Sequence, residues 1–152
     1  MRVLLQRVTH GSVQVHKKPI ARIGLGVVLL VGIGQSDTQT IVDQMAQKIV
    51  GLRVFKDQSE RLNHSLIDVG GAALVISQFT LYANTRHGRR PSFTEAARPE
   101  EARTLMDRFA SRLGQLGVTP VATGVFGASM AVEIHNDGPV TIWIDSDDWA
   151  NG

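Results

Sequence analysis

The sequence predicts an α+β protein in which strands outnumber helices. Two segments have the apolar spacing of amphipathic helices, and several short segments rich in Val, Ile and Leu have the composition of strands. The 152 residues, with 43% hydrophobic residues, 20% charged residues and a mean hydropathy near zero, are typical of one ordinary globular domain. We therefore expect residues 1–152 to form a single domain.

The first third of the chain predicts strands. Residues 2–9 and 12–16 are rich in Val and Leu, and the charged turn Lys17-Lys18-Pro19 follows them, which is typical of an antiparallel edge. Residues 25–33 are apolar throughout and predict a strand buried on both faces.

Two helices are expected. Ser36-Asp37 can cap the first, and Pro99, followed by Glu100 and Glu101, begins the second. Apolar residues recur at helical spacing in both, at Ile41, Val42, Met45, Ala46, Ile49 and Leu52, and at Ala102, Leu105, Met106, Phe109, Leu113 and Leu116. A strand at about 72–82 and a loop rich in Gly and Arg separate the helices, and strands at about 118–126, 129–135 and 140–145 follow them.

Several classes of function are excluded by composition. With no Cys, the chain has no disulfide, thiolate nucleophile or cysteine-ligated metal centre. The five histidines show no paired ligand spacing, so we expect no metal, and no residue implies a cofactor. The pairs Gly24/Gly26 and Gly32/Gly34 lack the third glycine of a dinucleotide fingerprint. No apolar run is long enough to span a bilayer, so we expect a cytoplasmic protein with no membrane partner.

The charge is uneven along the chain. The net charge is +2, but residues 133–152 contain five acidic residues and no Lys or Arg, which leaves 16 basic and 9 acidic residues in the remainder. A basic face of this kind permits a polyanionic partner, although it is also compatible with a solvated surface.

Two segments carry polar residues where strands end or are interrupted. Ala72 to Tyr82 passes from aliphatic residues into Ser77-Gln78-Phe79-Thr80, whose polar groups either satisfy the last hydrogen bonds of a strand or serve a site. The second segment, Asn136-Asp137-Gly138-Pro139-Val140-Thr141, has the composition of a hairpin turn. However, strand alternation resumes directly after Pro139, and glycine permits close approach to the backbone.

Together these segments resemble the two signature motifs of the D-aminoacyl-tRNA deacylases. The segments at 1–8, Gly88-Arg89-Arg90-Pro91-Ser92-Phe93 and 124–130 resemble the family in the same order, so the likeness covers essentially the whole chain. The resemblance implies a mostly antiparallel, barrel-like β core with two main amphipathic helices, and a homodimer with active sites at the subunit interface. It also implies hydrolysis of the ester between a D-amino acid and tRNA, with rejection of L-aminoacyl-tRNA.

The resemblance also implies roles for individual residues. Gly138 and Pro139, joined by a cis peptide bond in the family, would enter the partner's active site and select chirality, with Arg7, Asn136 and Thr141 in support. Gly138 and Pro139 would exclude an L-amino acid by colliding with its side chain. Because glycine has no side chain, glycyl-tRNA should also be accepted. Ser77, Gln78, Phe79 and Thr80 would form the catalytic segment.

Further expectations concern the chemistry and the tRNA. We assign the oxyanion contacts to the main chain of Phe79 and Thr80, with the Thr80 hydroxyl as a competing nucleophile that has no local base. Phe79's own side chain is expected in the core, and Arg7 either fastens the Gly-Pro segment or forms a surface ion pair. Arg86, Arg89 and Arg90 are candidate phosphate contacts, with Lys17, Lys18 and Arg22 as extensions. The rival hypotheses are a non-catalytic tRNA-binding dimer and a relaxed deacylase acting on L-alanyl-tRNA.

Overall fold

The computed structural model describes residues 1–151. Its strands are β1 (Arg2–Val15), β2 (Lys18–Ile23), β3 (Gly26–Gly32), β4 (Phe55–Lys56), β5 (Leu62–His64), β6 (Ala72–Ser77), β7 (Val121–Thr123) and β8 (Ala131–Asp145). The α-helices are α1 (Gln39–Gly51) and α2 (Pro99–Gln115), and the 3₁₀ helices are η1 (Phe79–Tyr82) and η2 (Ser146–Asn151).

One six-stranded sheet organises the chain. Its order is β2-β1-β3-β6-β7, and β8 pairs with the long strand β1 as well. The β1 pairings are antiparallel, whereas β3 with β6 and β6 with β7 are parallel. The short strands β4 and β5 form a separate two-stranded ribbon. The predicted α+β class, with two main helices and a mostly antiparallel, barrel-like β core, is confirmed.

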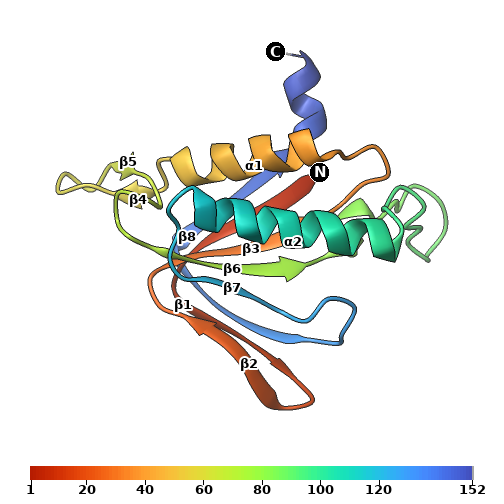
Figure 1. Ribbon diagram of the computed structural model, residues 1–152, viewed down its shortest axis with the longest axis horizontal. Coiled ribbons are helices and arrows are strands. Elements are labelled where there is room, and N and C mark those ends of the chain that lie inside the picture. Colours follow the sequence, from red (N-terminus) through yellow and green to blue (C-terminus); the bar gives the residue numbers. More distant parts are fainter. Residues whose placement is uncertain (152) are drawn as a thin grey trace.

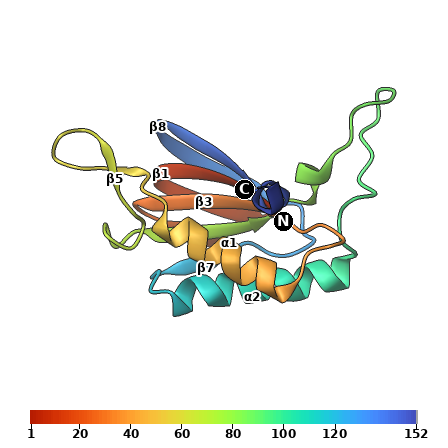
Figure 2. The same cartoon turned by 90° about the horizontal axis from the view of Figure 1, so that it is seen from above.

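Both helices cover the same face of the sheet and lie side by side (Figures 1 and 2). The larger core lies between them and the sheet, and it includes Phe109 of α2 and Met45 of α1. On the other face of β3 and β6, curled strands enclose a second apolar cluster that contains Val28, Leu74 and Ile76. The central strands are therefore buried on both faces, which is why residues 25–33 show no polar alternation.

The helix boundaries differ from the prediction at one end. α2 begins at Pro99, as expected, because proline fits the first helical position. The first helix is capped by Thr38, whose side chain accepts from the Ile41 amide, instead of by Ser36-Asp37. Asp37 is used elsewhere, since its carboxylate accepts from the Gly34 amide and from the Met1 amino group.

Two expected strand divisions are wrong. Segments 2–9 and 12–16 are one strand, β1, and segments 129–135 and 140–145 are one strand, β8. Because β8 runs along almost the whole of β1, residues 136–141 lie inside a strand instead of forming a hairpin turn. The strand expected at 118–126 is confined to Val121–Thr123. Among the helices described, none is long and apolar enough to cross a membrane.

Candidate active site

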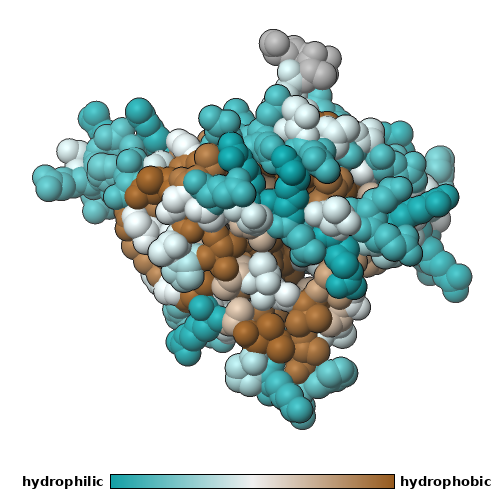
Figure 3. Space-filling view, in the orientation of Figure 1, coloured by the Kyte–Doolittle hydropathy of each residue, from teal (hydrophilic) through white to brown (hydrophobic). Residues whose placement is uncertain are grey.

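A cavity of about 530 Å³ opens where β6 ends. The residues that line it include Val31, Ile76 and Ser77 of the sheet, Ala97 just before α2, and Ala102 and Met106 of α2. The β7–β8 loop closes the remaining side with Phe126, Gly127, Ala128 and Met130. Apolar surface is visible below α2, on the side of that loop (Figure 3). The cavity is mostly apolar, with polar groups only at the β6 end.

The polar edge is the turn from β6 into η1. The Gln78 amide still belongs to the sheet, donating to the Val31 carbonyl, and the Leu81 amide donates back to the Gln78 carbonyl. Between them, the amides of Phe79 and Thr80 have no protein acceptor among residues 1–151, and Gln78 provides no side-chain cap. The first amides of a helix point outward without intrahelical partners. The turn therefore presents two adjacent donors beside the cavity.

Arg2 and Tyr82 hold this turn in place, and sequence reasoning missed both. The Arg2 guanidinium donates to the Leu81 carbonyl (3.1 Å) and the Asp145 carboxylate (2.8 Å), and it lies 4.3 Å from the centre of the Tyr82 ring. Burial, with the nearby Asp37 charge, raises the pKa of Tyr82, so the phenol stays neutral. A Cβ at Gly34 would lie 2.6 Å from the Tyr82 hydroxyl oxygen, so packing accounts for that glycine.

The side chains of the first motif are placed as follows. Ser77 ends β6 opposite Val31 and lines the cavity with Gln78 and Phe79. The Gln78 side-chain amide donates to the Thr80 hydroxyl oxygen. No hydrogen bond joins that hydroxyl to a carboxylate or imidazole within the described chain, so the structure supplies no base for a Thr80 nucleophile.

Phe79 is not a core residue, contrary to expectation. Its side chain is 58% exposed and meets the Phe93 ring edge-on, with the ring centroids 5.0 Å apart. The main chain turns at Gln78, which points the following side chain out of the sheet. Phe93, which is not among the predicted site residues, therefore joins Phe79 at the cavity wall. An aromatic residue inside a polar, Arg-rich loop is the sequence signal that could have identified it.

The second motif is a looped-out segment of β8, here named the selector loop (residues 136–141). Asn136 pairs with Val8 and Thr141 pairs with Gln6. The chain therefore advances five residues along β8 where it advances two along β1, and the extra residues of β8 bulge out as a loop. Asn136 closes the base of the loop: its side chain donates to the Thr141 hydroxyl (2.7 Å) and accepts from the Val140 amide (3.2 Å). Gly138 and Pro139, joined by a cis peptide bond, are exposed at the loop's tip.

Arg7 lies beneath the selector loop and is only 3% exposed, so the surface ion-pair interpretation is wrong. Its guanidinium donates to the Asp137 carbonyl (3.2 Å) and to the Val54 carbonyl (2.8 Å), and it lies 3.3 Å from the Asp137 carboxylate. A planar group with several fixed donors suits two carbonyls approaching from different elements. Arg7 thus fastens the selector loop to the segment after α1.

The two motifs lie far apart within one chain. The loop is anchored near Arg7, which pairs with Val27 of β3, whereas Ser77 pairs with Val31. Four strand residues correspond to about 13 Å, and the spacings from β8 across β1 and β3 to β6 add about 14 Å sideways. Neither Gly138 nor Pro139 lines the cavity. A single chain therefore does not bring its selector loop to its own cavity.

A basic loop (residues 83–98) projects from the sheet at the cavity end (Figure 2). Arg86, Arg89 and Arg90 are exposed on it. Main-chain bonds between Asn84 and Ser92 close the base of its tip, and Phe93 and Ala96 on its return limb line the cavity. Lys17 lies in the turn between β1 and β2, and Lys18 begins β2, a separate part of the fold.

A mostly apolar cavity edged by unbonded amides has the arrangement of hydrolases that stabilise an oxyanion. Comparisons with known proteins agree with that class. The profile of a family described as D-Tyr-tRNA(Tyr) deacylase matches residues 4–145. A D-aminoacyl-tRNA deacylase of Thermomicrobium roseum is 57% identical over 152 residues, covering 100% of this chain and 98% of that one. One of Chloroflexus aurantiacus is 56% identical, covering 96% and 91%.

Solved structures show the same fold. A protein described as c-Myc DNA unwinding element binding protein superposes with a TM-score of 0.90 at 39% identity, covering 95% of this chain and 98% of that one. A probable eukaryotic D-amino acid tRNA deacylase superposes with a TM-score of 0.81 at 19% identity, covering 94% and 97%. The chain belongs to the D-Tyr-tRNA(Tyr) deacylase family, and as such it is a hydrolase.

Proposed function

We propose that residues 1–152 act as one domain that hydrolyses the ester of D-aminoacyl-tRNA, releasing the D-amino acid and intact tRNA. The observation that carries the proposal is the pair of unbonded amides of Phe79 and Thr80 beside an apolar cavity, in a chain of this family. Such a substrate places the protein in the cytoplasm, where aminoacyl-tRNA is used.

The cavity suits the terminal adenosine of a charged tRNA. Its volume, about 530 Å³, lies within the range of small-molecule sites, roughly 300–1,000 Å³. Phe93, Phe126 and Met130 offer flat or soft apolar surface to a base. With the base held there, the ester on the terminal ribose lies toward the β6 end, where the two amides are.

The reaction then needs few groups from the protein. Water adds to the ester carbonyl carbon, the carbonyl oxygen becomes an oxyanion bound by the Phe79 and Thr80 amides, and the ribose oxygen leaves with a proton. The neighbouring hydroxyl of the terminal ribose can help to position that water. Ser77 and Gln78 orient the strand end and the substrate.

Replacing Thr80 by alanine tests main-chain catalysis. Because the mechanism uses the Thr80 amide and not its hydroxyl, we expect Thr80→Ala to keep most of its D-tyrosyl-tRNA deacylation rate in single-turnover assays. A nucleophilic hydroxyl predicts instead a loss of several orders of magnitude with the fold intact, since such a nucleophile is essential to its mechanism. Circular dichroism confirms the fold of the variant.

A second copy of the chain completes the site in this proposal. The selector loop lies about 13 Å along the strands and about 14 Å across them from the end of β6 in its own chain, so it reaches a cavity only in a partner subunit. Its exposed tip, Gly138 and Pro139, is free to enter that cavity. The two copies of a two-fold dimer would exchange their loops, which gives two equal sites.

The selector loop supports discrimination between mirror-image substrates. Main-chain carbonyls at Gly138 and Pro139 form a wall fixed by the proline ring, and Arg7 and Asn136 hold the wall in place. An L side chain would project into this wall, whereas a D side chain projects away from it. Glycine has no side chain to collide, so glycyl-tRNA passes the same filter.

The basic loop supplies the contact with the tRNA backbone. Arg86, Arg89 and Arg90 lie on the loop whose return limb forms the cavity wall, so a phosphate chain leaving the cavity meets them. Phosphate contacts carry no sequence information, which fits an enzyme that acts on more than one tRNA.

One assay tests the proposal: deacylation of D-tyrosyl-, L-tyrosyl-, L-alanyl- and glycyl-tRNA by purified protein in the presence of a chelator. We expect the D and glycyl esters to be hydrolysed and the L esters to survive. If no ester is hydrolysed while tRNA still binds with salt-dependent affinity, the protein is a non-catalytic tRNA-binding dimer. If L-alanyl-tRNA is hydrolysed as fast as the D ester, it is a relaxed deacylase.

A further inference from the structure

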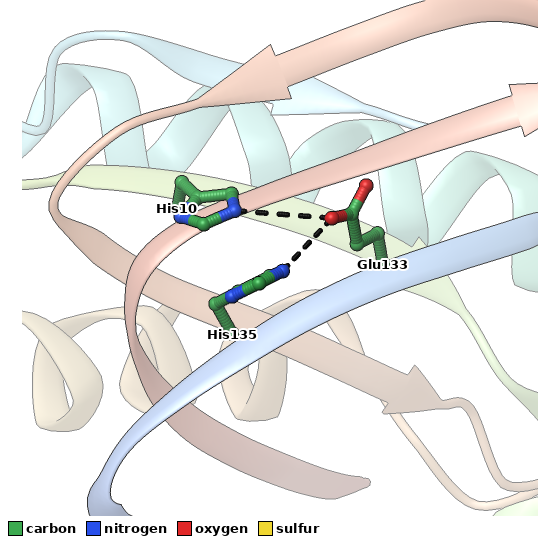
Figure 4. A group of neighbouring side chains, drawn as sticks. All are labelled: His10, Glu133 and His135. Carbon is green, nitrogen blue, oxygen red and sulfur yellow. Dashed lines mark hydrogen bonds and ion pairs between the residues drawn. The ribbon is translucent and has the colours of Figure 1, made fainter.

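A cluster of two histidines and a glutamate lies on the β1–β8 pair, away from the cavity (Figure 4). Nε2 of His135 is 2.8 Å from Oε1 of Glu133, and Nε2 of His10 is 3.8 Å from the same oxygen. The three ligand atoms all lie within 4.8 Å of one another. None of the three residues lines the cavity or belongs to the selector loop.

The strand pairing builds this cluster. His10 and His135 are direct partners across β1 and β8, and their rings stack with centroids 3.7 Å apart. Glu133 lies two residues before His135 and therefore projects from the same face of β8. All three side chains therefore project from paired β-strands, not from a flexible loop.

The donors and their spacing match a divalent transition-metal ion. Imidazole nitrogen and carboxylate oxygen are ordinary zinc ligands, and two His with one Glu is a known zinc ligand set. Metal bonds of about 2.1 Å at tetrahedral angles place ligand atoms about 3.4 Å apart. The two contacts to Glu133, 2.8 and 3.8 Å, lie on either side of this spacing.

The remaining surroundings also suit a metal site. Oε2 of Glu133 accepts a hydrogen bond from the Ser12 hydroxyl at 3.2 Å, which leaves Oε1 directed at the two imidazoles. A partner on the second oxygen is the usual way in which proteins orient a ligating carboxylate. His10 is 33% exposed, His135 51% and Glu133 59%, so water has access to the remaining coordination position.

We propose that His10, Glu133 and His135 bind one divalent ion of the zinc class, with water as the remaining ligand. The ion cross-links β1 to β8 immediately before the selector loop, since His135 is three residues from Gly138. It therefore stabilises the folded chain. The inference does not depend on the proposed function.

The test is titration of the full-length, chelator-treated protein with Zn²⁺ by calorimetry, and with Co²⁺ by visible absorption. We expect one ion per chain and a melting temperature that rises with Zn²⁺. Changing an orienting partner alone weakens metal affinity about 10–100-fold, so losing a ligand in His10→Ala, His135→Ala or Glu133→Gln should weaken it at least tenfold. The cobalt absorption bands should weaken or shift in the same variants.

Exposed His87 supplies a matched control. His87→Ala removes an imidazole from the basic loop and should leave Zn²⁺ affinity unchanged. The three cluster variants remove exposed or half-exposed side chains, so their metal-free stabilities should stay within about 0.5 kcal/mol of the parent. The proposal is overturned if the parent shows no saturable binding, or if the cluster variants bind Zn²⁺ as tightly as the His87 variant.

Discussion

Gly138→Ala is expected to lower the rate of D-tyrosyl-tRNA deacylation about 100-fold, the scale of effect of a 1 Å misplacement in a site. Gly138 has a φ of +123°, where an L side chain is strained, and an added Cβ would lie 3.0 Å from Nη2 of Arg7. The side chain would therefore displace the loop tip or the guanidinium that holds it. Single-turnover rates with D- and L-tyrosyl-tRNA measure the effect on activity and on discrimination.

Gly117→Ala separates this local effect from backbone strain. Gly117 has a φ of +102°, and an added Cβ would make only an ordinary contact, 3.6 Å from Ile67 Cδ1. Both substitutions should reduce the free energy of unfolding by about 1–3 kcal/mol, measured by denaturant titration. Only Gly138→Ala should lose deacylation. Equal rates in the two variants would show that the selector loop does not touch the substrate.

Arg7→Ala should damage both stability and activity. The Val54 carbonyl loses its buried donor, and an unsatisfied buried polar group costs about 1–3 kcal/mol. Asp137 loses its partner at the same time, so the selector loop is free to move. We expect a fall in the deacylation rate of about 100-fold, together with weaker discrimination between D- and L-tyrosyl-tRNA.

Two variants show whether Arg7 acts by positioning the loop. Arg7→Lys keeps the charge but cannot donate to both carbonyls in the same fixed geometry, so its rate should lie between those of the parent and Arg7→Ala. Arg108→Ala removes a half-exposed arginine that forms two hydrogen bonds with Asp43 and should cost no more than about 1 kcal/mol. Unchanged discrimination in Arg7→Ala would contradict the positioning role.

Periodicity was a good guide where one face of an element is buried. The spacing in 99–116 predicts α2 because Met106, Phe109 and Leu113 pack on the sheet at helical intervals. Periodicity does not identify β3, which is covered on both faces and is predicted instead by its continuous apolar run. It failed at β1 and β8, where a strand continues through a turn-like composition because its partner continues beside it. The presence of a hydrogen-bonded partner strand depends on tertiary structure, so the continuation of β1 and β8 could not be predicted from local composition.

The sequence motifs of the site could be predicted, but the spatial arrangement of their residues could not. Residues 77–80 and 136–141 are identifiable by resemblance, which also implies the supporting role of Arg7, yet nothing local indicates that Arg2 holds the η1 turn from β1. Phe79 is exposed because the main chain turns at Gln78. The apolar residues before Gln78 predict instead that the strand continues, so the turn could not be predicted from composition. The histidine cluster escaped notice for a related reason: His10 and His135 are 125 residues apart in the sequence and meet only through strand pairing.

The long strand β1 also fixes the spacing between the two arginines that support the motifs. Arg2 holds the η1 turn and Arg7 holds the selector loop, and because Arg7 lies five positions after Arg2, an odd offset, the two side chains project from opposite faces of one strand. A single inserted or deleted residue between them would place both side chains on the same face, so one of the two motifs would lose its support. Variation in chain length therefore belongs in the basic loop or the β4–β5 ribbon, because β1 sets the spacing on which both motifs depend.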